Sequence, residues 1–327
     1  MTRSRLVSVV IPAFNATATL RTTLASAMAQ SHRALEIIVV DDGSTDDTCA
    51  IAEECAMGDA RVQLILQQNA GVAAARNAGW RRARADLIAF LDADDLWAPT
   101  MIERQLAAFQ AGGPRVGLVY SGSVLIDRDG VVTKLMPLLS IHGDVLDRLF
   151  TSNFVGNGSA SMMTRQALID ADGFDPALRA RGAQGGEDYL LQCRIAEKYD
   201  FAMVPEHLVG YRCLPTNMSS DRPRMLRSWM LVVDEMHRRH PERAHLLHRG
   251  VRGCCTRLVL DAIAKGAFRQ LPELIALTGR LPASVAISVP LWDIPAAVIN
   301  HVRTLLGRLM RQTAGSSRAP GPHLPFG

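Results

Sequence analysis

Three carboxylates follow an apolar run in the segment LIAFLDADDLW, residues 87–97. Asp92 and Asp94 flank Ala93, and Asp95 follows directly. Aspartates in this arrangement are common in a turn that leads into a helix, where they accept hydrogen bonds from the backbone. They also suit a hard divalent cation, which takes oxygen ligands and bridges the phosphates of a substrate. The chain has few lysines, so a bound cation would supply the positive charge that a diphosphate needs.

Polar residues follow several predicted strands in the same way. Apolar and β-branched runs predict strands at 6–14, 36–42, 62–66 and 86–92, separated by helical patterns at 18–30, 45–57 and 72–84. This alternation indicates a parallel α/β sheet, in which ligands bind beyond the carboxyl ends of the strands. We therefore expect Asn15, Asp41, Asp42, Asp92 and Asp94 to converge on one edge of the sheet.

The segments after the first two strands have the composition of a nucleoside pocket. In IPAFNA, the backbone around Pro12 offers polar groups, Phe14 offers an apolar wall and Asn15 a polar contact. Asp41 and Asp42 close the next strand, where a carboxylate can accept hydrogen bonds from a base or a ribose.

Arg76 and Asn77 interrupt a helix of small residues in NAGVAAARNAGW, residues 69–80. The small residues alone are explained by close helix packing. A guanidinium among them also suits a contact with a nucleotide or its phosphates.

Together these segments resemble a known family. VSVVIPAFNA, EIIVVDDGSTDDT, AGVAAARNAG and FLDADD are similar, in this order, to the motifs of the family 2 inverting glycosyltransferases. The resemblance covers about the first third of the chain and implies the GT-A fold, a Rossmann-like parallel or mixed sheet flanked by helices. It also implies a nucleotide-sugar donor, Mg²⁺ or Mn²⁺ as cofactor, and a set of donor-binding residues. These are Pro12, Ala13, Phe14, Asn15, Asp41 and Asp42 for the nucleoside, Arg76 for the donor, and Asp92, Ala93 and Asp94 for the diphosphate and metal.

An acidic pair opens a predicted helix in GGEDYLLQCRI, residues 185–195. Acidic residues at a helix N-terminus are explained by the helix dipole alone. The family resemblance implies instead that Asp188 is the general base. A sugar hydroxyl is not ionised at neutral pH, so a carboxylate must take its proton as the new bond forms. Attack opposite the leaving nucleotide inverts the anomeric centre, and Glu187 would orient the site or contact the acceptor.

The segment YRCLPTNMSS resembles the Tyr-Arg element of the family, but no histidine follows it through Ser220. We therefore expect no third protein ligand to the metal, and we expect Arg212 to contribute charge near the acceptor or leaving group. The Gln-x-x-Arg-Trp signature of processive synthases is absent, since Ser228 separates Arg227 from Trp229. Transfer of a single sugar is the expected reaction.

The composition is that of a globular protein, with 48% hydrophobic and 21% charged residues. No apolar run reaches the ~20 residues of a membrane-spanning helix. The N-terminus leads directly into a predicted strand, without the apolar core and cleavage site of a secretory signal. The six cysteines show no CxxC pair or zinc spacing and are expected to be reduced thiols. These features predict a cytoplasmic protein.

Positive charge is concentrated near the C-terminus. Residues 1–111 and 112–221 each have 10 Lys+Arg and 13 Asp+Glu, whereas 222–327 have 16 and 6. We expect a GT-A domain at 1–221, with a nucleotide-binding half at 1–111 and an acceptor-binding half at 112–221 that holds a smaller mixed sheet. A helical region at 222–312 and a disordered tail at 313–327 would follow. The predicted helix at 296–312 would pack on the protein's own core or lie on an anionic membrane as a peripheral contact.

The sequence predicts an inverting, metal-dependent transfer of sugar from a nucleotide-diphosphate sugar to a hydroxyl of a glycan or lipid-linked acceptor. No nucleic-acid partner is expected. A haloacid-dehalogenase-type phosphatase also carries Asp-x-Asp after an apolar strand, but on an early strand and with Thr or Val where this chain has Leu96. A non-catalytic sugar-nucleotide-binding homologue, acting as sensor or assembly partner, is the other alternative. The presence of Asp92, Asp94 and Asp188 favours an enzyme.

Overall fold

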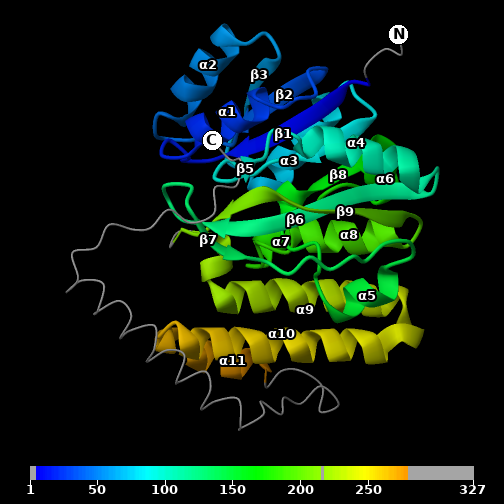
Figure 1. The fold of residues 1–327 in the computed structure, drawn as a ribbon. Coiled ribbons are helices and arrows are strands. Elements are labelled where there is room, and N and C mark those ends of the chain that lie inside the picture. The colour runs from blue at the N-terminus through cyan, green and yellow to red at the C-terminus, as the bar shows by residue number, and fades with distance from the viewer. Residues whose placement is uncertain (1–4, 215–216, 279–327) are drawn as a thin grey trace.

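The computed structural model describes residues 5–214 and 217–278, which are built around one nine-stranded sheet (Figure 1). The strand order is β3-β2-β1-β4-β8-β6-β9-β5, and β7 pairs with β6. The strands are β1 (Val7–Ala13), β2 (Leu35–Asp41), β3 (Val62–Leu66), β4 (Leu87–Phe90), β5 (Leu96–Trp97), β6 (Val116–Ile126), β7 (Val132–Leu135), β8 (Ser161–Thr164) and β9 (Asp200–Arg212).

Helices cover both faces of this sheet. The α-helices are α1 (Leu20–Met28), α2 (Thr48–Gly58), α3 (Val72–Arg82), α4 (Met101–Gly112), α5 (Leu146–Thr151), α6 (Arg165–Asp170), α7 (Ala177–Ala180), α8 (Glu187–Ala196), α9 (Arg222–Arg239), α10 (Ala244–Ala264) and α11 (Leu271–Thr278). Short 3₁₀ turns are η1 (Gly158–Ala160), η2 (Met218–Ser220), η3 (Pro241–Arg243) and η4 (Phe268–Gln270). No helix within these described ranges is both long and apolar enough to cross a bilayer.

The predicted alternation of strands and helices in the first third is confirmed. β1 pairs in parallel with β2 on one side and with β4 on the other. The pairing with β4 ends at Val10↔Phe90, while the pairing with β2 continues to Ala13↔Asp41. The chain reverses its direction of strand addition at β1, and such a switch point leaves a crevice beyond the strand ends.

The predicted separate sheet in the middle section is wrong. β8 pairs antiparallel with β4 and with β6, and β6 pairs in parallel with β9. The exposed edge of β4 is thereby covered, so its backbone groups find partners in the same sheet. The apolar runs at 201–205 and 208–212 belong to the single strand β9.

Two hydrophobic clusters fill the two sides of the sheet. Alternate residues of β1 point to opposite faces, so Val9 packs with α1, α2 and α4, whereas Val10 packs with α3, α6 and α8. The second cluster continues into α9, α10 and α11, which form a further layer (Figure 1). Trp229 of α9 stacks on Tyr189 of α8, with ring centroids 4.8 Å apart.

The helices predicted at the start of the C-terminal region are confirmed as α9 and α10. They share one hydrophobic cluster with the sheet. The predicted helix at 296–312 and the predicted tail at 313–327 lie outside the described residues. The proposed division into domains stays a prediction.

Candidate active site

The polar clusters predicted from the sequence lie at one edge of the sheet. β1, β2, β4, β6 and β9 run in the same direction, because β8 is antiparallel to both β4 and β6. Their carboxyl ends place Asn15, Asp41, Asp92 and Arg212 along that edge. It is the edge at which α/β proteins bind their ligands.

Arg76 joins the Asp-x-Asp element to the acidic pair of α8. Arg76 is 3% exposed, and its Nη2 donates to Asp92 Oδ1 at 2.6 Å. Burial opposes the charge, but Asp92, Asp188 and Glu187 together raise the pKa of Arg76 above its ordinary value. Three carboxylates from two distant motifs therefore surround one buried cation.

The three aspartates after β4 have different surroundings. Asp95 is fully buried, and its oxygens accept from Ser159 Oγ at 2.6 Å and from Arg212 N at 2.9 Å. Burial and the neighbouring Asp94 and Asp92 raise its pKa well above the usual range. Burial and Asp92 likewise raise the pKa of Asp94 to about 6. Asp95 fixes the turn, and Asp92 and Asp94 remain the carboxylates available to a ligand.

The turn before β8 also contributes to the site. Asp92 N donates to Ser159 Oγ at 3.0 Å. A side chain on Gly158 would place its Cβ 2.9 Å from Arg76 Nη2, so glycine permits the Arg76–Asp92 ion pair to pack here. The sequence alone indicates no role for this turn, because its partners lie more than 60 positions away in the chain.

Asp188 and Glu187 begin α8, as predicted. Asp188 Oδ1 accepts from Tyr189 N at 2.7 Å, and Glu187 Oε2 accepts from Gly185 N at 2.9 Å. Burial raises the pKa of Asp188 to about 6, while Arg76 opposes the rise and Glu187 adds to it. Burial also raises the pKa of Glu187. A carboxylate with a raised pKa is a stronger base than an ordinary aspartate.

The predicted nucleoside-binding segment ends β1. Pro12 and Ala13 are buried, whereas Phe14 is 51% exposed, as an apolar wall for a ligand would be. Asn15 has a positive φ of 49°, and its Oδ1 accepts from Thr45 N at 2.9 Å. This bond joins the loop after β1 to the loop after β2.

Asp41 and Asp42 are both engaged within the protein. Asp41 Oδ1 accepts from the backbone and hydroxyl of Ser44. Asp42 is 3% exposed, with Oδ1 accepting from Gln67 Nε2 (2.6 Å) and Ala70 N (2.8 Å) and Oδ2 from Gly71 N (2.8 Å). Asp42 therefore fixes the loop that leads into α3, and its contact with a nucleoside stays a prediction.

Arg212 holds the loops of the site together. It is 3% exposed, and its Nε donates to the carbonyl oxygen of Asp94 at 2.7 Å. Its Nη1 donates to the carbonyl oxygen of Asp127 at 3.1 Å and also to that of Arg128. Its charge lowers the pKa of Asp94, against the larger effect of burial. The predicted contribution of charge fits this position, although its donors are occupied by carbonyl groups.

Asn77 fixes the position of Phe174, and the ring of Phe174 packs against Arg76. The Asn77 amide donates to the Phe174 carbonyl at 2.7 Å and accepts from Phe174 N at 3.0 Å and Trp80 Nε1 at 2.8 Å. The guanidinium of Arg76 lies 5.2 Å from the centroid of the Phe174 ring. Asn77 is thus a structural residue, a role that its place in a helix of small residues did not indicate.

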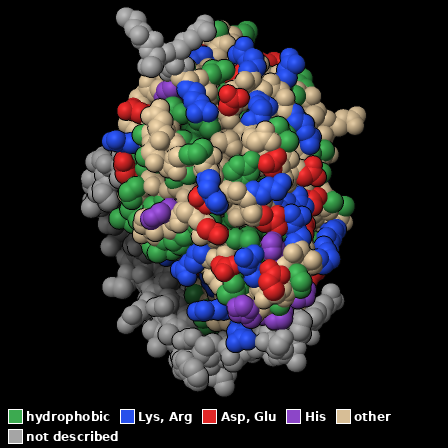
Figure 2. All heavy atoms as spheres, turned by 90° about the vertical axis from the view of Figure 1, so that its right-hand side faces the viewer, with side chains coloured by type: hydrophobic (Ala, Val, Ile, Leu, Met, Phe, Trp, Pro, Cys, Tyr) green, Lys and Arg blue, Asp and Glu red, His purple; other side chains and the backbone are tan. Residues whose placement is uncertain are grey.

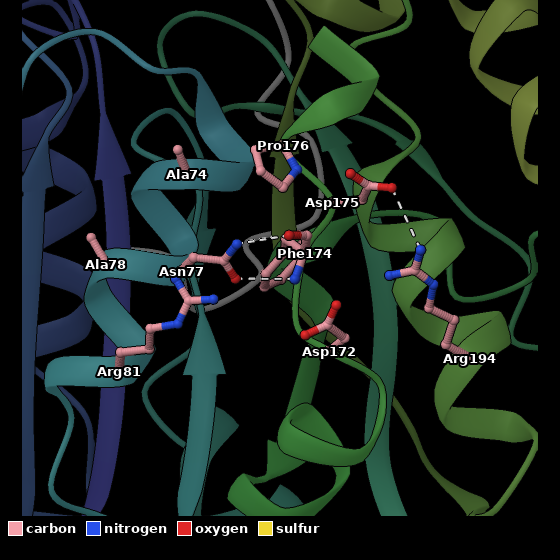
Figure 3. A pocket seen from close by; sticks show the side chains of 9 residues that line it. All are labelled: Ala74, Asn77, Ala78, Arg81, Asp172, Phe174, Asp175, Pro176 and Arg194. Carbon is pink, nitrogen blue, oxygen red and sulfur yellow. Dashed lines mark hydrogen bonds and ion pairs between the residues drawn. The ribbon is translucent and has the colours of Figure 1, made fainter. Parts of the chain in front are cut away.

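A pocket of about 330 Å³ lies beside Asn77 (Figure 3). It is lined by Ala74, Asn77, Ala78, Arg81, Asp172, Phe174, Asp175, Pro176 and Arg194. None of the predicted site residues lines it. Arg194 is paired with Glu235 at 2.7 Å and with Asp175 at 3.5 Å.

Asn77→Ala is expected to lower the free energy of unfolding by about 2–4 kcal/mol, because it leaves buried groups of Phe174 and Trp80 without partners. Urea denaturation measures the change. Gln166→Ala is the matched control, since its side chain is exposed and donates to the exposed Asp170. Equal losses for the two variants would show that the buried bonds of Asn77 add nothing.

Asp92 and Asp94 are the two carboxylates of this site that could bind a metal ion. Across the described part of the chain, no group of three or more His, Cys, Asp or Glu side chains is arranged to hold an ion. Asp92 and Asp94 are oxygen donors, as Mg²⁺ and Mn²⁺ require. Their proximity raises the pKa of Asp94 in addition to burial, an excess of negative charge that a cation would relieve. The donor set fits a metal that takes its other ligands from substrate and water.

A mixed α/β sheet with acidic residues at its carboxyl edge is the arrangement that the GT-A fold implies. The model of the family described as Glycosyl transferase family 2 matches residues 8–171, half of the chain, and the chain belongs to this family. The phosphatase alternative is therefore wrong.

Known relatives support this assignment. The chain is 38% identical over 129 residues to the UDP-Glc:alpha-D-GlcNAc-diphosphoundecaprenol beta-1,3-glucosyltransferase WfaP of Escherichia coli, covering 39% of this chain and 49% of WfaP. The chain spans less than half the length of the curated relatives that it matches at the highest significance.

Two solved structures share the fold over nearly the whole chain. One is residues 1–349 of TarS from S. aureus in complex with UDP-GlcNAc, with a TM-score of 0.65, 16% identity, and coverage of 94% of this chain and 92% of that one. The other is the mannosyltransferase PcManGT from Pyrobaculum calidifontis in complex with GDP-Man and Mn²⁺, with a TM-score of 0.57, 18% identity, and coverage of 93% and 88%. At these identities the likeness establishes the fold.

Proposed function

We propose that this protein is an inverting glycosyltransferase that moves one sugar from a nucleotide-diphosphate sugar to a hydroxyl of a glycan or lipid-linked acceptor. The position of Arg76 among Asp92, Asp188 and Glu187 is the observation that carries this proposal. Arg76 brings Asp92, which is predicted to bind the metal and diphosphate, into the same site as Asp188, the predicted general base. The nucleotide sugars bound by TarS and PcManGT and the lipid-linked acceptor in the name of WfaP support the substrate classes.

Asp188 would act as the general base. Its raised pKa, about 6, leaves it mostly ionised at neutral pH and able to take the proton of an attacking hydroxyl. The hydroxyl oxygen then bonds to the anomeric carbon while the bond to the leaving diphosphate breaks. Glu187 keeps its bond to Gly185 N and so shapes the loop that presents the acceptor.

Donor binding would use the other predicted residues. Phe14 would line the base, and the loops carrying Asn15, Asp41 and Asp42 would surround the ribose. Arg76 Nε is buried and has no hydrogen-bond partner among the described residues. Such an orphan donor is costly, and a phosphate oxygen that reached it would remove the cost.

Asp92 and Asp94 would hold Mg²⁺ or Mn²⁺ in this scheme. The bound ion would neutralise charge that develops on the departing diphosphate. The protein's own residues keep the carboxylates in place: Arg76 orients Asp92, and Arg212 fixes the backbone of Asp94.

Asp94→Asn is expected to weaken Mn²⁺ binding in the presence of UDP or GDP by at least about tenfold, because half of the carboxylate pair is lost. Titration calorimetry measures the affinity. Asp129→Asn is the control, since Asp129 is an exposed carboxylate on the nearby turn after β6. Unchanged Mn²⁺ affinity in Asp94→Asn would contradict the predicted metal site.

The test of the function is release of nucleotide from a panel of UDP- and GDP-sugars, with Mn²⁺ or Mg²⁺ and a mixture of glycan and lipid-linked acceptors. Acceptor-dependent release with at least one donor is expected. Binding of a nucleotide sugar without any turnover would instead support the non-catalytic sensor.

We place the protein in the cytoplasm, in peripheral contact with the inner face of the membrane. The excess of 16 basic over 6 acidic residues in 222–327 supports attraction to anionic lipid.

A further inference from the structure

An exposed apolar strip follows the turn between β6 and β7. Residues 133–140 are all exposed, and five consecutive ones, Leu135 to Leu139, are apolar. Leu135 is 53%, Leu138 40% and Leu139 45% exposed. Consecutive exposed apolar residues are unfavourable in water, so a run of this length indicates a surface that contacts something else.

The backbone of this apolar strip is fixed to the sheet. The carbonyl oxygen of Met136 lies 2.7 Å from His207 Nε2, and that of Leu139 lies 3.1 Å from the hydroxyl of Tyr120. A Cβ on Gly122 would overlap with the side chain of Leu138, so glycine lets the strip approach β6 closely. The exposed side chains therefore belong to an anchored segment.

The apolar strip begins beside the candidate active site. β7 starts at the sheet edge where β6 ends, directly after the turn at Asp127 and Arg128. Arg212 links this turn to the Asp-x-Asp element, donating to the Asp127 carbonyl with Nη1 and to the Asp94 carbonyl with Nε. Arg212 thus connects the turn that precedes β7 to Asp94.

The charge within the strip favours an anionic partner. Lys134 is its one charged side chain and is exposed, whereas the exposed acidic residues Asp129 and Asp144 lie outside the strip. On the face of the molecule shown in Figure 2, acidic and basic side chains are interspersed. An apolar strip with a basic and no acidic side chain matches the headgroup region of an anionic bilayer.

We propose that residues 131–139 insert Leu135, Leu138 and Leu139 into the surface of an anionic phospholipid membrane. The insertion would set the carboxylate edge of the sheet at the height of the headgroups. Its purpose rests on the proposed function, because a lipid-linked acceptor presents its sugar at that height.

Liposome flotation of the full chain tests this surface. With vesicles of phosphatidylcholine and phosphatidylglycerol, Leu135→Gln/Leu139→Gln is expected to lower the partition coefficient about tenfold, because two inserted side chains are lost. The control Met57→Gln/Ile169→Gln removes two apolar side chains from α2 and α6, which are 83% and 52% exposed, and should float as the wild type does. Calorimetry with UDP or GDP and Mn²⁺ should give the same nucleotide affinity for all three proteins.

Equal flotation of both double variants, or no flotation of the wild type, would overturn the proposal. Flotation lost only on replacing Arg303, Arg308 and Arg311 would place the contact in the C-terminal region and overturn it too. A wild type that self-associates without floating, while Leu135→Gln/Leu139→Gln is monomeric, would make the strip an interface between copies and contradict it. Nucleotide binding is read separately, so failure of the proposed function appears as absent heat and not as lost flotation.

Discussion

Asp188→Asn is expected to lower kcat for sugar transfer by about 10³-fold or more while changing the affinity for the nucleotide sugar less than about twofold. The amide cannot accept the hydroxyl proton, and general-base catalysis contributes about 10²–10⁴-fold. Asn has nearly the shape of Asp and can still accept from Tyr189 N through its side-chain oxygen. Steady-state kinetics together with donor calorimetry separate the two effects.

The matched control for this change is Asp172→Asn. Asp172 is an exposed aspartate on the turn before Phe174, and its φ of 60° suits asparagine. It should retain wild-type kcat. Turnover within tenfold of the wild type in Asp188→Asn would refute the role of Asp188 as base.

The same carboxylate predicts the pH dependence of the reaction. Burial raises the pKa of Asp188 to about 6, against opposition from Arg76. A base acts only when deprotonated, so kcat/KM should rise with pH through about 6 and level off above it. In the Asp188→Asn variant this rise should be absent from the residual rate. A wild-type profile that is flat between pH 5 and 8 would contradict the prediction.

Because ligands of parallel α/β sheets bind beyond the carboxyl ends of the strands, the sequence predicted the part of the site that depends on local sequence. Asp92 follows an apolar strand, and Asp188 opens a helix, so each could be placed without knowing its partner. Their convergence depends on β8 and β6 extending the sheet beyond β4. The irregular middle section did not show that pairing, because short strands broken by turns leave a weak periodic signal.

The roles that the sequence alone did not indicate are those that come from distant contacts. Asp42, which is expected to contact a nucleoside, also accepts three hydrogen bonds from the loop before α3. Asp95 had no predicted role, and its oxygens accept hydrogen bonds from Ser159 and Arg212. The sequence therefore predicts that a carboxylate lies at a strand end, but it does not predict which hydrogen-bond donors surround that carboxylate.

Arg76→Met is expected to lower the free energy of unfolding at pH 7 by about 3–5 kcal/mol, because it removes one partner of a buried ion pair. The change leaves Asp92, Asp188 and Glu187 without their shared cation. Methionine keeps much of the side-chain volume and can still pack on Phe174, so the loss reports the charge more than a cavity. Urea denaturation followed by circular dichroism gives the value.

Arg82→Met, an exposed change on the same helix, should cost less than about 0.5 kcal/mol. The decisive comparison is the double variant Arg76→Met/Asp92→Asn. Neutralising Asp92 removes one of the carboxylates that Arg76 balanced, so the second change should restore at least about 1 kcal/mol of the loss. Strictly additive losses would mean that Arg76 stabilises the fold by packing alone. In that case the ion pair at 2.6 Å would not link the Asp-x-Asp element to the acidic pair of α8 energetically.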